Sequence, residues 1–475
     1  MRESGDASLI EYIAMSLRNA LRQVHDSSSV SAQTKLRALY GRIPARWKLG
    51  REFEAYCEEL SRNESRTREE LDAMQLGKLR AMVEHCYRQV PFYRERFDRI
   101  GFRPAQLRTL ADLRRIPPTT RDDLKNHFDQ LRAHKASTYK PENCYSGGST
   151  GEPVKMLLDR KAIALEKACV RRHWRRSGYK DGEPFVNMRG LRLATKPDEY
   201  WVVDKGENCL YLSSYHLTSN TVEAYVKALN GFEATLINCY PSSGWLLARL
   251  VEDRGLKVYS PRSIVCASET LYPHQRALIE SVFKTTVWDW YGLTELVGNA
   301  SECERHGGYH VSTEQGYFEV LDETGQSVQP GEPGEIVATG LHNFSMPLVR
   351  YRTGDLGTFT DDVCPCGRGS RLIKSIEGRA QDFIETPSGA RLTAGALNVH
   401  DKTWDNVVQF QYVQRPPDIV VLRVLKAASF AEADERRILK RMGARFGDGI
   451  RLEIEYVSEI PKTPRGKTPL IVRET

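Results

Sequence analysis

The sequence predicts an α/β protein, and three patterns along its 475 residues support that class. Residues 141–378 alternate short apolar segments, such as ATLINCY, SIVCASE and TTVWDWYG, with helical ones, such as TVEAYVKALN and LYPHQRALIESVF. Such alternation is typical of a sheet flanked by helices. Residues 309–360 read as a β-rich run with turns at DETG and PGEPG, and residues from about 380 onwards read as a small α+β region.

We expect two domains. Residues 1–378 form the larger, N-terminal domain, and its first 135 residues are mostly helical because REELDAMQLGKLRAMVEHCYRQ places apolar residues at helical spacing. Residues 379–475 form the small C-terminal domain, and the segment GRAQD at 378–382 is the expected hinge. The chain is long enough for a large core and a second lobe.

Composition excludes several classes of protein. The net charge of +7 is modest, and Lys and Arg are scattered without the aromatic stripe or reading module that nucleic-acid binding needs. Ten cysteines in a chain of this length do not form a disulfide scaffold. The N-terminus does not resemble a signal peptide, and no apolar run reaches the ~20 residues of a membrane span. We therefore expect a cytoplasmic protein with no nucleic-acid or membrane partner.

A glycine-rich loop is the first chemical signal. Residues 145–153 read YSGGSTGEP, in which glycines let backbone N–H groups turn toward an anion and hydroxyls add donors. Such a loop can wrap a triphosphate, although it is not a P-loop, because no Gly-Lys-Ser/Thr follows. Taken alone, it fits a surface turn equally well.

Four further motifs follow in order: YGLTE at 291–295, YRTGD at 351–355, GR at 378–379 and PKTPRGK at 461–467. Together with the loop they resemble the core motifs of the adenylate-forming superfamily, which includes acyl- and aryl-CoA ligases. The phenylacetate-CoA ligase and CapK-like branch is more similar still, on the segments LRAMVEHCYRQVPFYRERF, NCYPSSGWLLA, YGLTELVGNASECERHGGYHV, MPLVRYRTGDLG and CPCGRGSRL.

The resemblance implies a large adenylate-forming domain with α/β sheets and a β-rich subdomain, plus a small mobile α+β lid. It implies an ATP- and Mg²⁺-dependent ligase that joins a carboxylic acid, weighted toward an aromatic one, to AMP and passes the acyl group to CoA. Alternatives are transfer to an amine or a carrier-protein thiol, and a non-catalytic scaffold on the same fold. The presence of Glu295, Asp355 and Lys467 argues against the scaffold. The oligomeric state stays open, with a homodimer among the options.

The resemblance also assigns roles to residues. Lys467, Thr294 and Glu295 are the expected catalytic residues: Lys467 on a mobile loop contacts the α-phosphate and carboxylate oxygens, Thr294 reaches the α-phosphate, and Glu295 ligates Mg²⁺. Lys462 is the nearby alternative to Lys467. The expected ATP- or AMP-binding residues are Ser146, Ser149, Thr150, Gly151, Ala267, Ser268, Glu269, Tyr291, Gly292, Asp355 and Arg379. Asp382 is the expected hinge residue, and the expected acid pocket contains Tyr240, Pro241, Ser242 and Gly298.

A group of cysteines and histidines suggests a structural Zn²⁺ site. Cys364 and Cys366 lie one residue apart, and Cys303 and His310 lie upstream, so the four supply the ligand types of a tetrahedral site. His306 is the alternative fourth ligand. The C-x-C spacing is tighter than the commoner C-x-x-C, and free surface thiols are the competing interpretation.

Overall fold

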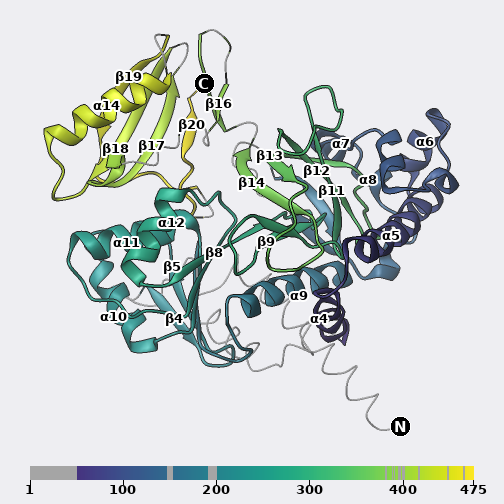
Figure 1. Cartoon of the computed structure of the whole chain (residues 1–475), viewed down its shortest axis with the longest axis horizontal. Helices are drawn as coiled ribbons and strands as arrows, with labels where there is room; N and C mark the ends of the chain where they lie inside the picture. The colour runs from purple at the N-terminus through teal and green to yellow at the C-terminus, as the bar shows by residue number, and fades with distance from the viewer. Residues whose placement is uncertain are drawn as a thin grey trace. The chain divides into compact units, whose positions relative to one another are not determined.

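The computed structural model describes residues 51–146, 153–190, 200–379, 382–387, 389, 391–393, 397, 402–415, 418–446, 449–463 and 466–474. The chain folds into two compact units (Figure 1). In the described part, unit 1 comprises residues between 51 and 177 and between 290 and 376, and unit 2 comprises those between 178 and 289 and beyond 376. Each unit is therefore built from segments that are far apart in the sequence.

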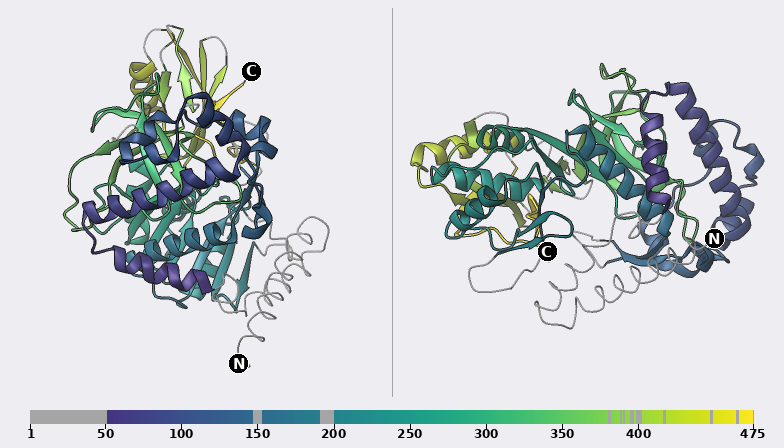
Figure 2. Two further views of the ribbon diagram at one scale, coloured as in Figure 1. Left: turned by 90° about the vertical axis from the view of Figure 1, so that its right-hand side faces the viewer. Right: turned by 90° about the horizontal axis from the view of Figure 1, so that it is seen from below.

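Unit 1 begins with helices. These are α4 (Arg51–Asn63), α5 (Arg68–Gln89), α6 (Pro91–Arg99), α7 (Arg121–Asn126), α8 (Phe128–Leu131) and α9 (Arg160–Arg176), with short 3₁₀ turns η1 (Pro104–Gln106), η2 (Leu110–Arg115) and η3 (Ala136–Tyr139). A capping box between Thr67 and Glu70 starts α5. The helix ends at Val90 because Pro91 follows it. Helix α4 packs against α9 (Figure 2).

Antiparallel pairing joins strands of unit 1 in the pairs β1–β2, β11–β12, β12–β13, β10–β14, β9–β10 and β8–β9. Strands β1 (Glu142–Tyr145) and β2 (Lys155–Leu158) form a hairpin. The larger sheet has the order β11-β12-β13-β14-β10-β9. Its strands are β9 (Asn299–Glu302), β10 (Tyr309–Val311), β11 (Gly316–Leu321), β12 (Pro333–Gly340), β13 (Tyr351–Thr360) and β14 (Leu372–Arg379). Strand β8 (Thr286–Gly292) enters this unit at Trp290 and pairs with β9. Apolar residues of α5, α6, β11 and β12 share one core.

Unit 2 contains a parallel sheet in the order β7-β6-β3-β5, with β4 antiparallel at its edge. The strands are β3 (Phe185–Arg189), β4 (Trp201–Asp204), β5 (Cys209–Ser213), β6 (Leu236–Cys239) and β7 (Ser263–Ala267). Helices α10 (Val222–Phe232), α11 (Pro241–Asp253) and α12 (Pro273–Phe283) lie together beside them (Figure 1). All four parallel strands end at the same edge, which is where open α/β sheets bind ligands.

The C-terminal part of unit 2 is a second layer of strands and one helix. It contains β15 (Phe383–Glu385), β16 (Arg391–Thr393), η4 (Lys402–Trp404), β17 (Val407–Arg415), β18 (Ile419–Lys426), α14 (Glu432–Phe446), β19 (Arg451–Tyr456) and β20 (Ile471–Arg473). The sheet order is β19-β18-β17-β20. Phe410 of β17 contacts Trp245 of α11, with ring centroids 5.8 Å apart, so this region shares a core with residues 178–289. The predicted α/β class, with a β-rich part and a small α+β C-terminal region, is confirmed.

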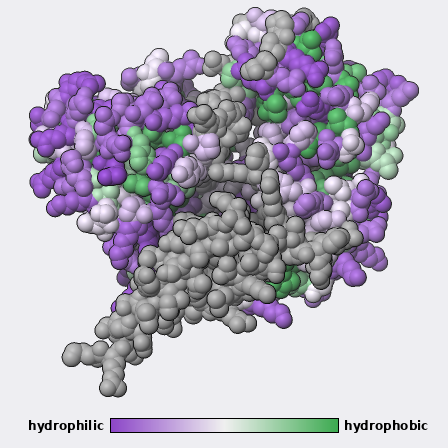
Figure 3. All heavy atoms as spheres, turned by 180° about the vertical axis from the view of Figure 1, so that it is seen from behind, coloured by the Kyte–Doolittle hydropathy of each residue, from purple (hydrophilic) through white to green (hydrophobic). Residues whose placement is uncertain are grey.

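The surface shows no large apolar face in the view of Figure 3, where hydrophobic residues are scattered among hydrophilic ones over the coloured part of the chain. None of the helices in the described ranges has both the length and the apolar character needed to cross a bilayer.

Candidate active site and metal centre

The carboxyl ends of β3, β6 and β7 bring together polar residues of unit 2. Arg189 is the last residue of β3, Tyr240 follows β6, and Ser268 follows β7. Arg189 Nη1 donates to Ser268 Oγ at 3.1 Å, and Arg189 Nη2 donates to the Asn238 side-chain oxygen at 2.7 Å. The guanidinium carbon lies 4.7 Å from the centroid of the Tyr240 ring. Three neighbouring parallel strands thus form one polar wall.

The loop after β19 carries Lys467 to this wall. Lys467 Nζ donates to the backbone carbonyl of Ser268 at 2.6 Å and lies 5.5 Å from the Tyr240 ring centroid. A turn shapes the loop, because Gly466 N donates to the Thr463 carbonyl at 2.8 Å. Lys462 points elsewhere: its ammonium donates to the carbonyls of Ser214 and Tyr215 at 2.6 and 3.2 Å. Lys462 therefore anchors the loop, whereas Lys467 reaches the strand ends.

Glu269 lies behind the wall. Its Oε2 accepts a hydrogen bond from the backbone N–H of Ser242 at 3.0 Å, at the start of α11. Burial raises the pKa of Glu269, and the charges of Lys467 and Arg189 act in the opposite direction. Tyr240, Pro241 and Ser242, which were predicted to line the acid pocket, all lie at this junction of β6 and α11.

The expected hinge lies in unit 2 as well. Arg379 ends β14, and Asp382 N donates to its carbonyl at 3.0 Å. Burial raises the pKa of Asp382, and Arg379 opposes that shift. Gly378 has a φ of 100°, and a Cβ there would lie 3.3 Å from Thr270 Oγ1, just beyond the Ala267–Glu269 segment. The hinge segment therefore runs close to the end of β7.

In unit 1, the YGLTE and YRTGD motifs meet at a partly buried hydrogen bond. Tyr291 Oη donates to Asp355 Oδ2 at 2.7 Å. Burial and the neighbouring Asp355 carboxylate hold the pKa of Tyr291 well above its usual range, so the phenol stays protonated and serves as the donor. Glu295 is buried, and its Oε1 accepts from Tyr351 Oη at 3.3 Å. Thr294, which precedes Glu295 in the sequence, is exposed.

Two glycines of this region have packing reasons for their identity. A Cβ at Gly292 would lie 2.5 Å from Trp290 Nε1, and a Cβ at Gly298 would lie 2.6 Å from the Phe318 ring. Gly298 was predicted to line the acid pocket. Its close packing on Phe318 explains the glycine without reference to a ligand.

Of the glycine-rich loop, the structure describes only the base. Ser146 is buried, and its hydroxyl accepts from Val154 N and from Arg121 Nη1, both at 3.1 Å. The Ser146 N–H donates to the Val154 carbonyl at 2.9 Å, which closes the β1–β2 hairpin. Ser149, Thr150 and Gly151 lie outside the described residues.

The four predicted zinc ligands converge in unit 1. One ligand atom from each of Cys303, His310, Cys364 and Cys366 lies within 4.8 Å of all the others. His310 Nδ1 lies 2.8 Å from Ser370 Oγ, and its Nε2 lies 3.3 Å from Cys366 Sγ. The Ser370 contact orients the ring with Nε2 toward the thiols, as outer partners of metal-bound histidines do. His306 is directed instead at Glu302 Oε2, 3.1 Å from its Nδ1.

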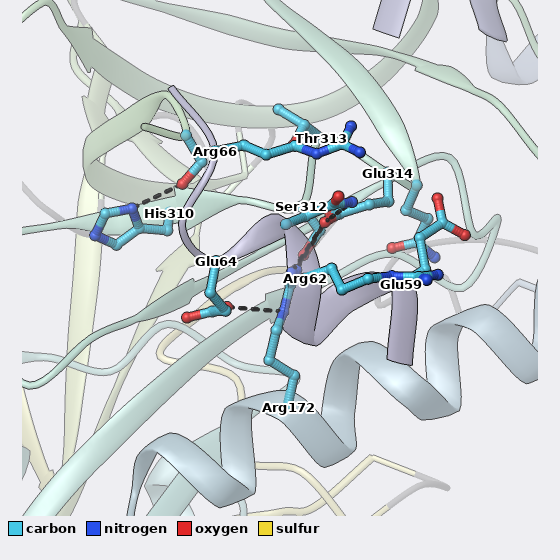
Figure 4. A network of polar contacts seen from close by, with 12 residues as sticks. Glu59, Arg62, Glu64, Arg66, Arg172, His310, Ser312, Thr313 and Glu314 are labelled. Carbon is cyan, nitrogen blue, oxygen red and sulfur yellow. Dashed lines mark hydrogen bonds and ion pairs between the residues drawn. The ribbon is translucent and has the colours of Figure 1, made fainter. Parts of the chain in front are cut away.

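A buried ionic network supports the loop that carries these cysteines. Glu64 forms ion pairs with Arg172, Arg176 and Arg368. Burial acts against its ionisation, but the arginines prevail and hold the pKa of Glu64 at about 2. Arg172 also pairs with Glu314 at 3.1 Å, as Figure 4 shows. Through Arg368 the cysteine loop is thus fixed to α4 and α9.

The structure sorts the predicted residues into two sets, one in each unit. Unit 2 holds those around Lys467, Ser268 and Tyr240 together with the hinge, and unit 1 holds those around Tyr291, Asp355 and the cysteines. Sequence reasoning missed Arg189. The signal was available, since Arg189 ends a predicted strand in the same alternating region as the strands that became β6 and β7, whose ends were assigned to the site.

Comparisons with known proteins match most of the chain. Residues 97–346 match the family model described as AMP-binding enzyme, and residues 384–474 match the CapK C-terminal domain. The phenylacetate-coenzyme A ligase of Thermus thermophilus is 29% identical over 340 residues, which cover 68% of this chain and 73% of that protein. Protein CapK of Staphylococcus aureus is 24% identical over 458 residues, covering 94% of this chain and 98% of CapK.

Among solved structures, a 2-hydroxyisobutyryl-CoA ligase in its postadenylation state with 2-HIB-AMP is similar in fold. The TM-score is 0.70 at 21% sequence identity, and the match covers 87% of this chain and 92% of that one.

Proposed function

We propose that this chain, which belongs to the AMP-binding enzyme family, is an ATP-dependent ligase that activates a carboxylic acid as its acyl-AMP and then transfers the acyl group to CoA. In the first step a carboxylate oxygen attacks the α-phosphorus of ATP, and the bond to pyrophosphate breaks. In the second step the CoA thiol attacks the acyl carbon, and AMP leaves. The phenylacetate-coenzyme A ligases that resemble the chain support this choice of acceptor.

The observation that carries the proposal is the position of Lys467. A lysine near the C-terminus of the chain lies 2.6 Å from the Ser268 carbonyl, at the carboxyl ends of three parallel strands. During adenylation charge develops on the oxygens of the α-phosphate while the carboxylate oxygen attacks and pyrophosphate leaves, and a cation fixed at that point stabilises it. A scaffold without activity would have no need for a long cation held at this edge.

Residues of unit 1 would bind the nucleotide. Asp355, oriented by Tyr291, offers carboxylate oxygens to the ribose hydroxyls, and Tyr291 with Gly292 forms one wall of the adenine pocket. Glu295 would ligate Mg²⁺, which favours carboxylate oxygens, and Thr294 would reach the α-phosphate. Ser146 with Ser149, Thr150 and Gly151 would hold the terminal phosphates. Nucleotide contacts by Ala267, Ser268, Glu269 and Arg379, which belong to unit 2, are predicted from the sequence resemblance.

The residues beyond 378 would act as the lid between the two steps. Asp382 lies directly after the β14 end, where a change in a few backbone torsions would move Lys467 away and admit the acceptor. The lid would then comprise residues 379–475, as expected from the sequence. In this structure those residues share a hydrophobic core with residues 178–289.

Zn²⁺ would have a structural role. The donor set of three thiols and one imidazole fits Zn²⁺, and four protein ligands leave no position for a substrate. The acid itself is proposed to be aromatic, following the named relatives, and to contact Tyr240, Pro241 and Ser242. A contact with Gly298, which belongs to unit 1, is predicted from the sequence alone. A cytoplasmic location and a homodimer stay predictions from the sequence.

The test is exchange of labelled pyrophosphate into ATP across a panel of aryl and aliphatic acids with Mg²⁺, for the wild type, Lys467→Ala and the exposed-helix control Lys440→Ala. We expect one class of acid to support exchange in the wild type and the control, and a loss of about 100-fold or more in Lys467→Ala. Thioester formation with CoA, compared with a parallel arm containing an amine, identifies the acceptor. Exchange that persists in Lys467→Ala, or its absence with every acid, would contradict the proposal.

A further inference from the structure

Two hydrogen bonds orient Arg189 at the strand ends, and among the described residues no carboxylate neutralises it. Its two terminal nitrogens donate to Ser268 Oγ and to the Asn238 side chain, and its guanidinium lies over the Tyr240 ring. These contacts use two of the five N–H groups of the guanidinium, and within the described part of the chain no carboxylate forms an ion pair with it. The two hydrogen bonds therefore orient the guanidinium, while its other N–H groups remain available to a ligand.

A second cation lies at the same wall. Lys467 Nζ contacts the carbonyl of Ser268, the residue whose hydroxyl contacts Arg189, and both cations lie within 5.5 Å of the Tyr240 ring centroid. Two like charges at one wall repel each other, and the arrangement becomes more favourable when an anion binds between or beside them.

A single acid, Glu269, interacts electrostatically with both cations and cannot balance the charge of the two. Burial raises the pKa of Glu269, and its Oε2 is engaged by the Ser242 N–H. Its Oε1 is buried without a hydrogen-bond partner among the described residues. The wall thus presents excess positive charge to whatever enters at the ends of β3, β6 and β7.

We propose that Arg189 binds the carboxylate of the acid substrate before the reaction and so determines that the substrate enters as an anion. This inference rests on the proposed ligase function. It adds Arg189 to the site and gives Arg189 and Lys467 different roles. A planar guanidinium matches the two oxygens of a carboxylate. Arg189 belongs to the sheet and keeps its place whatever the loop does, whereas Lys467 belongs to the loop. Arg189 is therefore a substrate-positioning residue, and Lys467 stabilises the transition state.

The two roles predict different kinetics. Loss of an interaction present equally in the bound substrate and the transition state raises KM and leaves kcat unchanged, whereas loss of a transition-state contact lowers kcat. Removal of a hydrogen-bonded charge raises the KM for the acid by about 10- to 100-fold. Arg189→Gln should show this rise with the KM for ATP unchanged, and Lys467→Ala should show a fall in kcat.

The experiment measures pyrophosphate exchange with the acid that the wild type activates, over ranges of acid and of ATP, in Arg189→Gln, Arg189→Lys and Arg436→Gln. Arg436 is an exposed helix residue, so its variant removes the same charge away from the site. The primary amide of the acid serves as a competitor with no negative charge. We expect the wild type to bind the acid at least 10-fold more tightly than the amide, Arg189→Gln to lose that preference, Arg189→Lys to retain part of it and Arg436→Gln to match the wild type.

Three outcomes would overturn the inference while leaving the ligase function intact: an unchanged KM for the acid in Arg189→Gln, a rise in the KM for ATP instead, or an unchanged preference for acid over amide. If Arg189→Gln does not fold, as judged by circular dichroism, Arg189→Lys serves as the test. A fall in kcat with an unchanged KM for the acid in that variant would contradict the role of Arg189 in binding the carboxylate. A wild type that activates no acid would instead remove the ligase function, and the inference with it.

Discussion

Lys467 and Ser268 meet at a backbone carbonyl, with Lys467 Nζ 2.6 Å from the oxygen. Ser268 adopts a φ of 73°, in the left-handed region that residues other than glycine rarely occupy. That conformation directs its carbonyl to Lys467 while its hydroxyl accepts from Arg189. Strain of this kind costs about 1–3 kcal/mol, and strained residues cluster at active sites and ligand-binding positions. One strained residue therefore contacts both cations.

Gly466→Ala should slow adenylation without weakening substrate binding. Gly466 has a φ of 73°, and a Cβ there would lie 2.5 Å from Ser214 Oγ and 2.8 Å from Gly190 Cα. The loop would have to move, and Lys467 would move with it. Since a displacement of about 1 Å costs roughly 100-fold in rate, we expect kcat for pyrophosphate exchange to fall by about that factor, with the KM for ATP unchanged.

Gly443→Ala is the matched control. Gly443 lies in α14, and a Cβ there would meet nothing within 4 Å. Alanine in a helix is more stable than glycine by about 0.5–1 kcal/mol, so this variant should keep the wild-type kcat and melt at a slightly higher temperature. Equal kcat values for the two alanine variants would show that the Gly466 conformation does not position Lys467.

Tyr291→Phe should weaken ATP binding. The Tyr291 hydroxyl donates to Asp355 Oδ2 at 2.7 Å, and Asp355 is the proposed partner of the ribose. Loss of a hydrogen bond to a charged group costs about 1.5–3 kcal/mol, of which only the orienting part appears in ligand binding. We expect the KM for ATP to rise about 5- to 20-fold, and to rise further in Asp355→Ala. Steady-state exchange over a range of ATP measures this, and an effect on the acid alone would refute the assignment.

Purified protein should contain one Zn²⁺ for each chain, measured by elemental analysis. His310→Ala and Cys366→Ser should lose most of it and melt several degrees lower, because a structural zinc site contributes directly to folding energy.

Two variants test the specificity of this site. His306 is directed at Glu302, so His306→Ala should retain the zinc, and Cys144 lies outside the group, so Cys144→Ser should retain it too. Zinc retained by His310→Ala but lost by His306→Ala would show that the ligand assignment is wrong.

Short-range patterns in the sequence predicted several strands and the superfamily of this protein. The segments PFVNMRG, ATLINCY and SIVCASE became β3, β6 and β7, and the ordered motifs identified the superfamily and the phenylacetate-CoA ligase and CapK branch, which the family and relative matches confirm. Helix and strand periodicities and motif spacing are properties of neighbouring residues, so one sequence is enough to detect them.

Relationships across long separations could not be predicted in the same way. Lys462 and Lys467 look alike in the sequence, and only their contacts with Ser214 and Ser268, each about 200 or more residues away, distinguish the anchor from the reaching side chain. Arg189 resembles a solvated arginine until β6 is placed beside β3 and β7 beside β6. The core shared by the C-terminal region and residues 178–289 likewise depends on tertiary packing, such as that between Phe410 and Trp245.

Acid should destabilise the protein partly through His342. Burial and the charge of Lys78 lower the pKa of this histidine from 6.5 to about 3, although the Glu314 carbonyl, 3.0 Å from Nε2, and the Glu314 charge act in the opposite direction. The folded state therefore binds its proton less readily than the unfolded state. The stability that neutral His342 provides is complete above pH 6.5 and is lost as pH falls toward 3. Between pH 7 and pH 5 the loss is about 2 kcal/mol.

His342→Gln isolates this contribution, because glutamine can still donate to the Glu314 carbonyl but does not titrate. Urea unfolding at pH 7 and pH 5 should show that the free-energy advantage of the wild type over His342→Gln shrinks by about 2 kcal/mol at the lower pH. His134 is exposed, so His134→Gln should leave the pH dependence unchanged. A wild type and a His342→Gln variant that lose the same stability over this range would show that His342 is accessible to protons in the folded state.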